Sequence, residues 1–477
     1  MSRLFAALAF ALPLASGCGP AAVPREDQVY RRLFDEPLEP FFAPETAEDG
    51  TLRYAAQRLG ASGLARFPAA KGPKVRRVFI LGGSSAQHFV KTHLHSLLRR
   101  ALPDLEFELV DCGMRYHDSS RDLLLTREVL GYAPDLLIVM SGSDEGAPGA
   151  VAGPIERSQA LRSLLRAASK LRLADEARLL LRESRAPDPV RVEHWFEGEL
   201  RTLVREAKQR GVPVLLCTLP WSFSDTPPAG FLPLDKRAFF EPWFQYERGA
   251  AAHAARLFKA HLAALPAKRT PERAFTEYYL AKSLDEAGDS AGAREHYLRA
   301  SESVVPPMAA LNAVVRRLSL EEGVPFADLE RHFLEAYPGW VPGRDSFDDA
   351  FHWTRGWDAG VCAVLARAMA AASTRGALFA PGEEWDIEGL ESLIAGAPKP
   401  PAGEYDRTAG WTGAELKLWE VEEVGDGRSR EPLVAAMGRL LDWRPDLFVK
   451  PGGAQRWLVE RIAAESNVDG MERRVKE

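Results

Sequence analysis

The stretch Val78-Phe79-Ile80-Leu81-Gly82-Gly83-Ser84-Ser85-Ala86 decides the fold. Its continuous apolar run predicts a strand over residues 77–81 that is buried on both faces. Two glycines and two serines end the run, and the pattern that follows predicts a helix from about residue 85 to 100. A strand that ends in a glycine turn exposes a hydroxyl at the start of the next helix. Ser84 is therefore a candidate nucleophile.

Four more apolar runs follow along the chain and alternate with helical patterns. The strands are expected at 107–110, 135–140, 212–218 and 324–328. The main helices are expected at 121–130, 155–210 and 311–320, and from the segment around residue 352 through Ala371. This alternation predicts an α/β fold with a doubly wound parallel five-stranded sheet flanked by helices. The functional crevice of such a sheet lies beyond the carboxyl ends of its strands, where Ser84, Gly113 and Asp144 fall.

A second candidate motif lies far along the chain, in Asp349-Ala350-Phe351-His352. An aspartate and a histidine three residues apart can supply a general base and the carboxylate that orients it. Each feature alone has a plain alternative, because Ser84 could cap a helix and His352 could be a surface histidine. Their order along the chain favours a serine hydrolase with Ser84 as nucleophile, His352 as base and Asp349 as the orienting group.

The N-terminal residues predict an exported protein. Arg3 is followed by the apolar stretch Leu4–Leu14, which is far shorter than the roughly 20 residues that a membrane span needs. We therefore expect a signal peptide over residues 1–17. Small residues before Cys18 resemble a bacterial lipobox, which implies acylation of Cys18 and anchoring in the cell envelope, at the outer membrane or the periplasmic face. Ordinary secretion with an unmodified Cys18 is the alternative.

Charge and residue counts exclude several kinds of partner and cofactor. The formal net charge is −6 over 477 residues, and no basic block is present, so nucleic acid is not an expected partner. The cysteines beyond residue 18 are too few for a disulfide framework. The spacing of the histidines near the first strand matches no zinc site, and no metal or cofactor is expected.

Accessory segments surround the core. Residues 18–70 are predicted to be a lipid-anchored tether with short helices near 28–34 and 52–59. Residues 376–410 contain several glycines and prolines and are predicted to be a linker. Residues 411–477 alternate charged and apolar segments, which predicts a helical C-terminal extension without assigned chemistry.

Residues 272–303 change to a helical spacing on two arms separated by Ala-Gly-Asp. This pattern predicts an antiparallel helical hairpin. It resembles one tetratricopeptide-type repeat, which cannot bury its own apolar face and must pack on the core or on neighbouring helices. A hairpin that binds a protein partner and an ordinary insertion hairpin are both compatible with the pattern.

Taken together, residues 75–372 resemble the SGNH/GDSL hydrolase family, in particular bacterial lipoproteins of this type with a tetratricopeptide-like insertion. The nucleophile block corresponds to Gly82-Gly83-Ser84-Ser85, with a glycine where the family usually has an aspartate before the serine. The fifth block, Asp-x-x-His, is intact at Asp349 and His352. The stretch 212–220 and Asn312 also correspond to features of these lipoproteins.

The resemblance implies an esterase or acyltransferase without a cofactor, which forms an acyl-enzyme on Ser84. The oxyanion would be held by the backbone N–H groups of Ser84 and Gly113 and by the side chain of residue 144. Acylated small molecules, glycans and lipids of the cell envelope are the implied substrates. Because hydrolysis and acyl transfer use the same residues, the sequence does not separate them.

Asp144 departs from the family pattern. The third block is usually Gly-x-Asn, whereas the chain has Gly142-Ser143-Asp144. An asparagine donates an N–H to the oxyanion, and losing one such donor typically costs on the order of 3 kcal/mol. A carboxylate accepts and adds negative charge, unless it stays protonated or turns away. The alternative is a catalytically degenerate relative that binds a glycan or a protein partner.

Overall fold

The computed structural model describes residues 40–56, 66–89, 91–114, 117–145, 189–225, 228, 237–302, 306–343, 345–347, 350–373 and 385–396. At the centre of these residues lies a five-stranded parallel sheet in the order β5-β4-β6-β7-β8. The strands are β4 (Val75–Gly82), β5 (Glu106–Gly113), β6 (Leu136–Met140), β7 (Val214–Thr218) and β8 (Phe326–Asp328). The predicted fold class is confirmed, and each strand overlaps its expected range.

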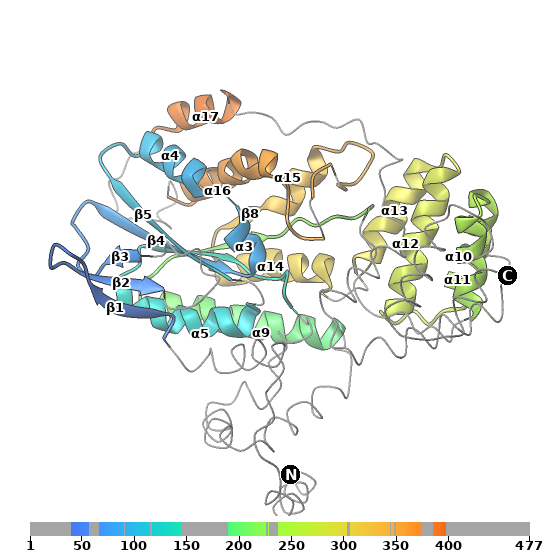
Figure 1. The fold of residues 1–477 in the computed structure, drawn as a ribbon, viewed down its shortest axis with the longest axis horizontal. Helices are drawn as coiled ribbons and strands as arrows, with labels where there is room; N and C mark the ends of the chain where they lie inside the picture. The colour runs from blue at the N-terminus through green and yellow to red at the C-terminus, as the bar shows by residue number, and fades with distance from the viewer. Residues whose placement is uncertain are drawn as a thin grey trace, which may run out of the picture.

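Helices cover both faces of this sheet (Figure 1). Alternate side chains of a strand point to opposite faces, so Val78 and Ile80 belong to one core and Phe79 and Leu81 to the other. The first core includes α4 (Lys91–Ala101), α15 (Leu329–Glu335) and α16 (Asp358–Ser373). The second includes α5 (Ser119–Val129), α9 (Pro189–Gln209) and α14 (Met308–Glu322). Burial on both faces explains why the strands are apolar without alternation.

The helix predicted over residues 85–100 is interrupted. The chain forms the short α3 (Ser84–His88), turns to an extended conformation at Phe89, and begins α4 at Lys91. The ring of Phe89 is buried in the core. The ammonium of Lys91 donates to the carbonyls of Ala86 and Gln87 at 2.6 and 2.9 Å, which satisfies acceptors left open at the end of α3. These two contacts stabilise the break.

The short helix predicted near 52–59 is wrong for the described part of that range. The strands β1 (Phe42–Thr46), β2 (Leu52–Ala56) and β3 (Arg66–Pro68) form an antiparallel sheet beside the main one. Rings from the small sheet pack on the rings of Phe79 and Tyr132, with Phe67–Phe79 centroids 5.4 Å apart and Tyr54–Tyr132 centroids 4.5 Å apart. Packing against a distant part of the chain favours the strand here over the local helical pattern.

The buried Arg77 ties the two sheets together. Its guanidinium donates to Glu108 at 2.6 Å, to the carbonyl of Tyr132 at 2.7 Å and to the carbonyl of Pro68 at 2.7 Å. It also lies 4.7 Å from the centroid of the Phe67 ring. Because its charge is paired and hydrogen-bonded, its burial is compatible with a stable core.

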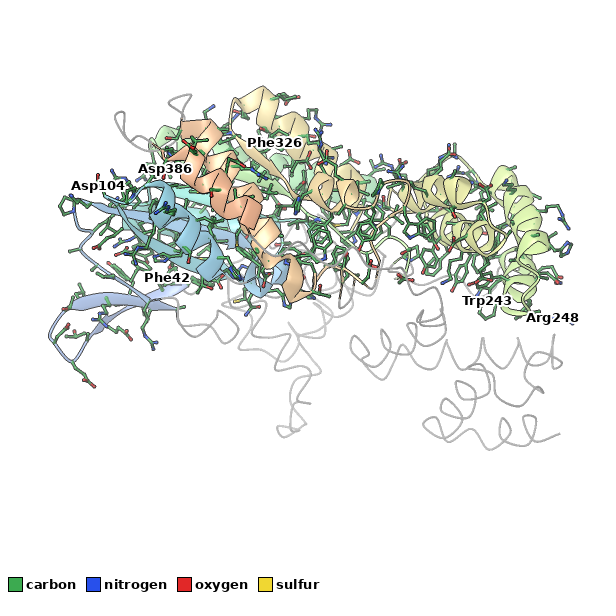
Figure 2. All side chains as sticks on the ribbon, turned by 90° about the horizontal axis from the view of Figure 1, so that it is seen from above. Phe42, Asp104, Trp243, Arg248, Phe326 and Asp386 are labelled. Carbon is green, nitrogen blue, oxygen red and sulfur yellow. The ribbon has the colours of Figure 1, made fainter. Side chains whose placement is uncertain are left out.

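The predicted hairpin at 272–303 is present as α12 (Pro271–Glu286) and α13 (Ser290–Ala300), with Gly288 at φ +88° in the turn. Two helices that the sequence analysis did not predict precede it, α10 (Arg237–Glu247) and α11 (Ala251–Ala264). All four form one bundle beside the sheet domain, and Figure 2 shows Trp243 and Arg248 at its far end. Pro242 inside α10 is unfavourable for a helix and hides it in the sequence. The resemblance to a tetratricopeptide repeat stays a prediction.

The linker predicted over 376–410 is wrong over part of its length, because α17 (Ile387–Gly396) lies within it. Asp386 begins this helix by accepting the N–H of Gly389 at 2.7 Å, and its own N–H donates to the carbonyl of Ala101 at 2.8 Å. Leu390 is buried in the first core. The segment is therefore part of the packed domain.

Several predictions concern residues outside the described ranges: the signal peptide, Cys18, the helix near 28–34, part of 155–210, Asp349 and the extension 411–477. Among the helices that are described, none has the length and apolar character needed to cross a bilayer.

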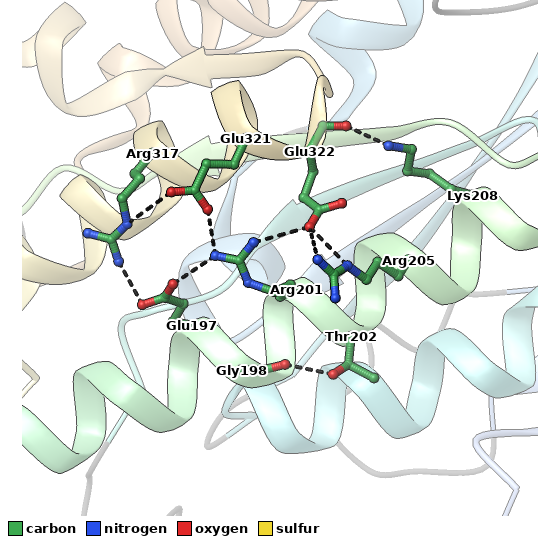
Figure 3. A network of polar contacts seen from close by, with 9 residues as sticks. All are labelled: Glu197, Gly198, Arg201, Thr202, Arg205, Lys208, Arg317, Glu321 and Glu322. Atoms are coloured by element: carbon green, nitrogen blue, oxygen red, sulfur yellow. Dashed lines mark hydrogen bonds and ion pairs between the residues drawn. The ribbon is translucent and has the colours of Figure 1, made fainter.

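An ion-pair network joins α9 to α14 (Figure 3). Arg201 lies at its centre and contacts Glu197 at 2.8 Å, Glu321 at 2.6 Å and Glu322 at 3.1 Å. Single exposed pairs contribute little to stability, about 0–1 kcal/mol each. Arg201 of α9 thus pairs with two carboxylates of α14 and with one of its own helix.

Candidate active site

Ser84 lies at the predicted edge of the sheet. It is the first residue of α3 and follows the interior strand β4, whose neighbours are β5 and β6. Asp144 lies beyond the end of β6. In sheets with this strand order, ligands bind at the switch point between the first and third strands, which here are β4 and β6. The structure thus brings Ser84 and Asp144 together at the place where the fold itself favours a site.

The segment that carries His352 contacts α3. Ser85 Oγ donates to the carbonyl of Phe351 at 3.4 Å, and His88 Nε2 lies 3.2 Å from the carbonyl oxygen of Trp353. The ring centroids of His88 and His352 are 5.0 Å apart. The predicted base therefore lies beside the helix that begins with the predicted nucleophile. Asp349 lies outside the described residues, so its orienting role stays a prediction.

The contacts between α3 and residues 351–353 place Ser84 and His352 on adjacent segments of the chain. Hydrogen bonds of catalytic groups are often long in free enzymes and shorten when substrate binds. In the free protein, the relevant feature is therefore that His352 lies close to the helix that begins with Ser84, the predicted nucleophile.

The carboxylate of Asp144 faces the backbone of the nucleophile. Its Oδ2 accepts the N–H of Ser84 at 3.1 Å and the hydroxyl of Ser143 at 3.2 Å. A Cβ atom at Gly83 would lie 1.8 Å from the same oxygen, so residue 83 must lack a side chain for Asp144 to hold this position. Asp144 is not turned away from the site, and it serves there as an acceptor.

Gly113 is packed tightly at the end of β5. A Cβ atom at this position would lie 2.2 Å from the backbone nitrogen of Gln87 in α3. Its N–H donates to Asp111 Oδ1 at 2.9 Å. Both backbone N–H groups predicted to hold the oxyanion, those of Ser84 and Gly113, therefore donate to carboxylates in this structure. Their oxyanion role stays a prediction.

Asp111 is in turn paired with Lys91. The Lys91 ammonium lies 2.7 Å from Asp111 Oδ2, and it also caps α3 as described above. Burial lowers the pKa of Lys91, and the charge of Asp111 partly offsets this effect. One partly buried lysine thus links α3, α4 and the end of β5, and it supports the helix that carries Ser84.

A group of buried carboxylates behind Asp144 was not predicted from the sequence. Burial raises the pKa of both Asp122 and Glu145 well above the usual range, and the nearby charge of Asp144 adds to the effect on Asp122. Asp122 accepts the hydroxyl of Ser141, and Glu145 accepts the N–H of Ser119 at 2.5 Å. The signal was visible as acidic residues at 118, 122, 144 and 145, in the segments that follow β5 and β6. No group that could hold a metal ion occurs among the described residues.

The segment that follows β7 supports the histidine loop. Asn312 holds its first residue through two hydrogen bonds, accepting the N–H of Leu219 at 2.9 Å and donating to the Leu219 carbonyl at 2.8 Å. Trp221 stacks on Phe351 with ring centroids 6.5 Å apart, and the N–H of Ser222 donates to the carbonyl of Ala350 at 3.0 Å. Asn312, which was singled out only through the family resemblance, thus supports the loop of His352 indirectly. It holds the segment 219–222, and that segment contacts Ala350 and Phe351.

The helical bundle reaches the same segment. Tyr278 of α12 donates its hydroxyl to the carbonyl of Ser224 at 2.9 Å. Residues 219–225 therefore lie between the bundle and the loop that carries His352. The bundle and the candidate site belong to one continuous packing arrangement, whose rings share the first core.

Known proteins were compared with the whole chain. No protein-family model matches it, and no curated protein matches it either. Solved structures of lipases and esterases are similar to it. GDSL-like lipases are among them.

Three of these structures illustrate the extent of the likeness. A GDSL-like lipase from Bacteroides thetaiotaomicron is 11% identical, with 63% of this chain and 89% of that chain covered and a TM-score of 0.30. A lipase/acylhydrolase from Enterococcus faecalis is 15% identical, with 63% and 96% covered and a TM-score of 0.31. An acetylxylan esterase from Geobacillus stearothermophilus is 14% identical, with 64% and 95% covered and a TM-score of 0.31. At these identities the likeness concerns the fold alone.

Proposed function

We propose that this protein is an SGNH-type serine esterase that acts through an acyl-enzyme on Ser84. The observation that carries the proposal is the contact between α3, which begins with Ser84, and residues 351–353, which include His352. In the proposed reaction, His352 takes the proton of Ser84 Oγ while that oxygen attacks the ester carbonyl. The imidazolium then gives the proton to the leaving alcohol, and water releases the acyl group. Asp349 would orient the imidazole.

The proposal predicts that a fluorophosphonate labels Ser84 in the folded protein, with the modified peptide located by mass spectrometry. Ser84→Ala should take no label. His352→Ala should be labelled at least about 100-fold more slowly, because a general base typically contributes 10²–10⁴-fold. His93→Ala is the matched control, since His93 is exposed on α4 and should have no effect. A label that persists in Ser84→Ala would contradict the assignment of the nucleophile.

We also propose a class of substrate and a cellular location for this esterase. Ester or O-acyl groups on glycans, lipids or small molecules of the cell envelope are the proposed substrates, with water or a sugar hydroxyl as acceptor. The support is the N-terminal sequence, in which small residues precede Cys18. Cys18→Ser should release the protein from the membrane fraction of a bacterial host, as measured by fractionation and immunoblotting. A wild-type protein that is already soluble would contradict the anchor.

A second candidate function is favoured by the hydrogen bonds of the backbone around Ser84. The N–H groups of Ser84 and Gly113 both donate to carboxylates, and Asp144 stands where a donor is usual. Under this candidate the chain is a degenerate relative that binds a glycan or a protein partner without chemistry. It predicts no label on Ser84 in a folded wild-type protein, in contrast to the esterase proposal.

A further inference from the structure

Two side chains of α3 hold the backbone on either side of His352. Ser85 Oγ donates to the carbonyl of Phe351, and His88 Nε2 contacts the carbonyl of Trp353. A carbonyl oxygen can only accept, so His88 must carry a proton on Nε2. His88 lies four residues after Ser84, which places both side chains on the same side of the helix.

The ring of His88 also packs beside the ring of His352. Their centroids are 5.0 Å apart and their planes are inclined by 51°. At this separation, the His88 ring occupies space into which the His352 imidazole could otherwise rotate. His88 therefore restricts the side chain of His352 as well as the backbone that carries it.

The far side of the histidine loop is fixed by α16. Trp353 is fully buried, and its Nε1 donates to Asp358 Oδ1 at 3.0 Å. The loop is thus held between α3 and α16. The contact from α3 is the one that sets its position relative to Ser84, because His88 and Ser84 belong to the same short helix.

We propose that His88 is a positioning residue for the proposed reaction, which fixes His352 relative to Ser84 through its Nε2–H and its ring. Its catalytic consequence rests on the proposed esterase function. Misplacing a reacting group by about 1 Å can cost on the order of 100-fold in rate. Without the Nε2–H donor, the carbonyl of Trp353 loses its bond to α3, and the longer contact from Ser85 Oγ to the Phe351 carbonyl, at 3.4 Å, is left to hold the loop to that helix.

The test compares two variants of similar size. His88→Gln keeps an N–H donor at the end of the side chain, whereas His88→Leu has none. The rate of fluorophosphonate labelling of Ser84 should fall at least tenfold in His88→Leu and stay within about threefold of wild type in His88→Gln. His93→Leu is the control on α4 and should be unchanged. Equal rates in wild type and His88→Leu overturn the proposal. An equal loss in both His88 variants overturns the role of the Nε2–H.

A second measurement does not depend on activity. The nitrogen-15 shifts of the His88 ring, assigned by comparison with His88→Gln, should show a proton on Nε2 at neutral pH. A neutral ring protonated on Nδ1 alone would overturn the proposal whatever the labelling result. If wild type takes no label while His88 carries the Nε2 proton, the esterase function fails, whereas the tautomer that the contact requires is present.

Discussion

Asp144→Asn should raise the rate of fluorophosphonate labelling of Ser84 by tenfold or more at neutral pH. In the wild type, Asp144 Oδ2 accepts the N–H of Ser84. An asparagine can keep this bond with its carbonyl oxygen and present its N–H₂ to the oxyanion. Removing one oxyanion donor from an esterase site costs about 10²–10³ in kcat, so supplying one should recover a substantial part of that factor.

Asp144→Ala is the matched control for this prediction. It removes the negative charge without adding a donor, so its labelling rate should stay well below that of Asp144→Asn. If the two variants are labelled equally fast, the gain comes from lost charge, and the role of an amide donor is contradicted. No gain in either variant would favour the degenerate candidate. Second-order rate constants, measured on variants with unchanged thermal unfolding, decide between these results.

The position of Asp144 also accounts for Gly83. A Cβ atom at residue 83 would lie 1.8 Å from Asp144 Oδ2. The family pattern has an aspartate before the nucleophile and an asparagine in the third block. This chain has no side chain at the first position and a carboxylate at the second. In this structure, a side chain at residue 83 would require the side chain of residue 144 to move.

Gly82→Ala should destabilise the protein by about 4 kcal/mol or prevent its folding. Gly82 has φ +144°, and a Cβ atom there would lie 2.3 Å from the carbonyl oxygen of Met140 in the paired strand β6. Backbone of a central strand cannot move aside cheaply. Overpacking costs typically 1–3 kcal/mol, and an unfavourable backbone conformation adds on the order of 1–3 kcal/mol. Denaturant unfolding measures the loss.

Gly198→Ala is the matched control in a helix. Gly198 lies in α9, and a Cβ atom there meets no atom within 4 Å. Alanine is favoured over glycine in a helix by up to about 1 kcal/mol, so this variant should be more stable than wild type. A small effect of Gly82→Ala, within the range of ordinary surface changes, would contradict the close approach of β4 and β6.

The five strands and the location of Ser84 were predictable because their signals are local. A strand buried on both faces needs a continuous apolar run, and Val78–Leu81 supplies one next to two glycines. The helix predicted at 52–59 and the linker at 376–410 failed for the opposite reason. The rings of Phe67 and Phe79 stabilise the small sheet, and the contacts of Asp386 and Leu390 with the core hold α17.

The candidate site also has a part that local sequence signals predict and a part that depends on contacts between distant residues. Residue types and their order along the chain selected Ser84 and His352 as candidates, and the resemblance to the family marked Asp144 as a departure. They did not predict that Asp144 accepts the Ser84 N–H, or that His88 lies against His352. Such contacts join residues that are far apart in sequence, and no local pattern encodes their distance. They form only when the strands pair and the loops beyond them are packed against α3.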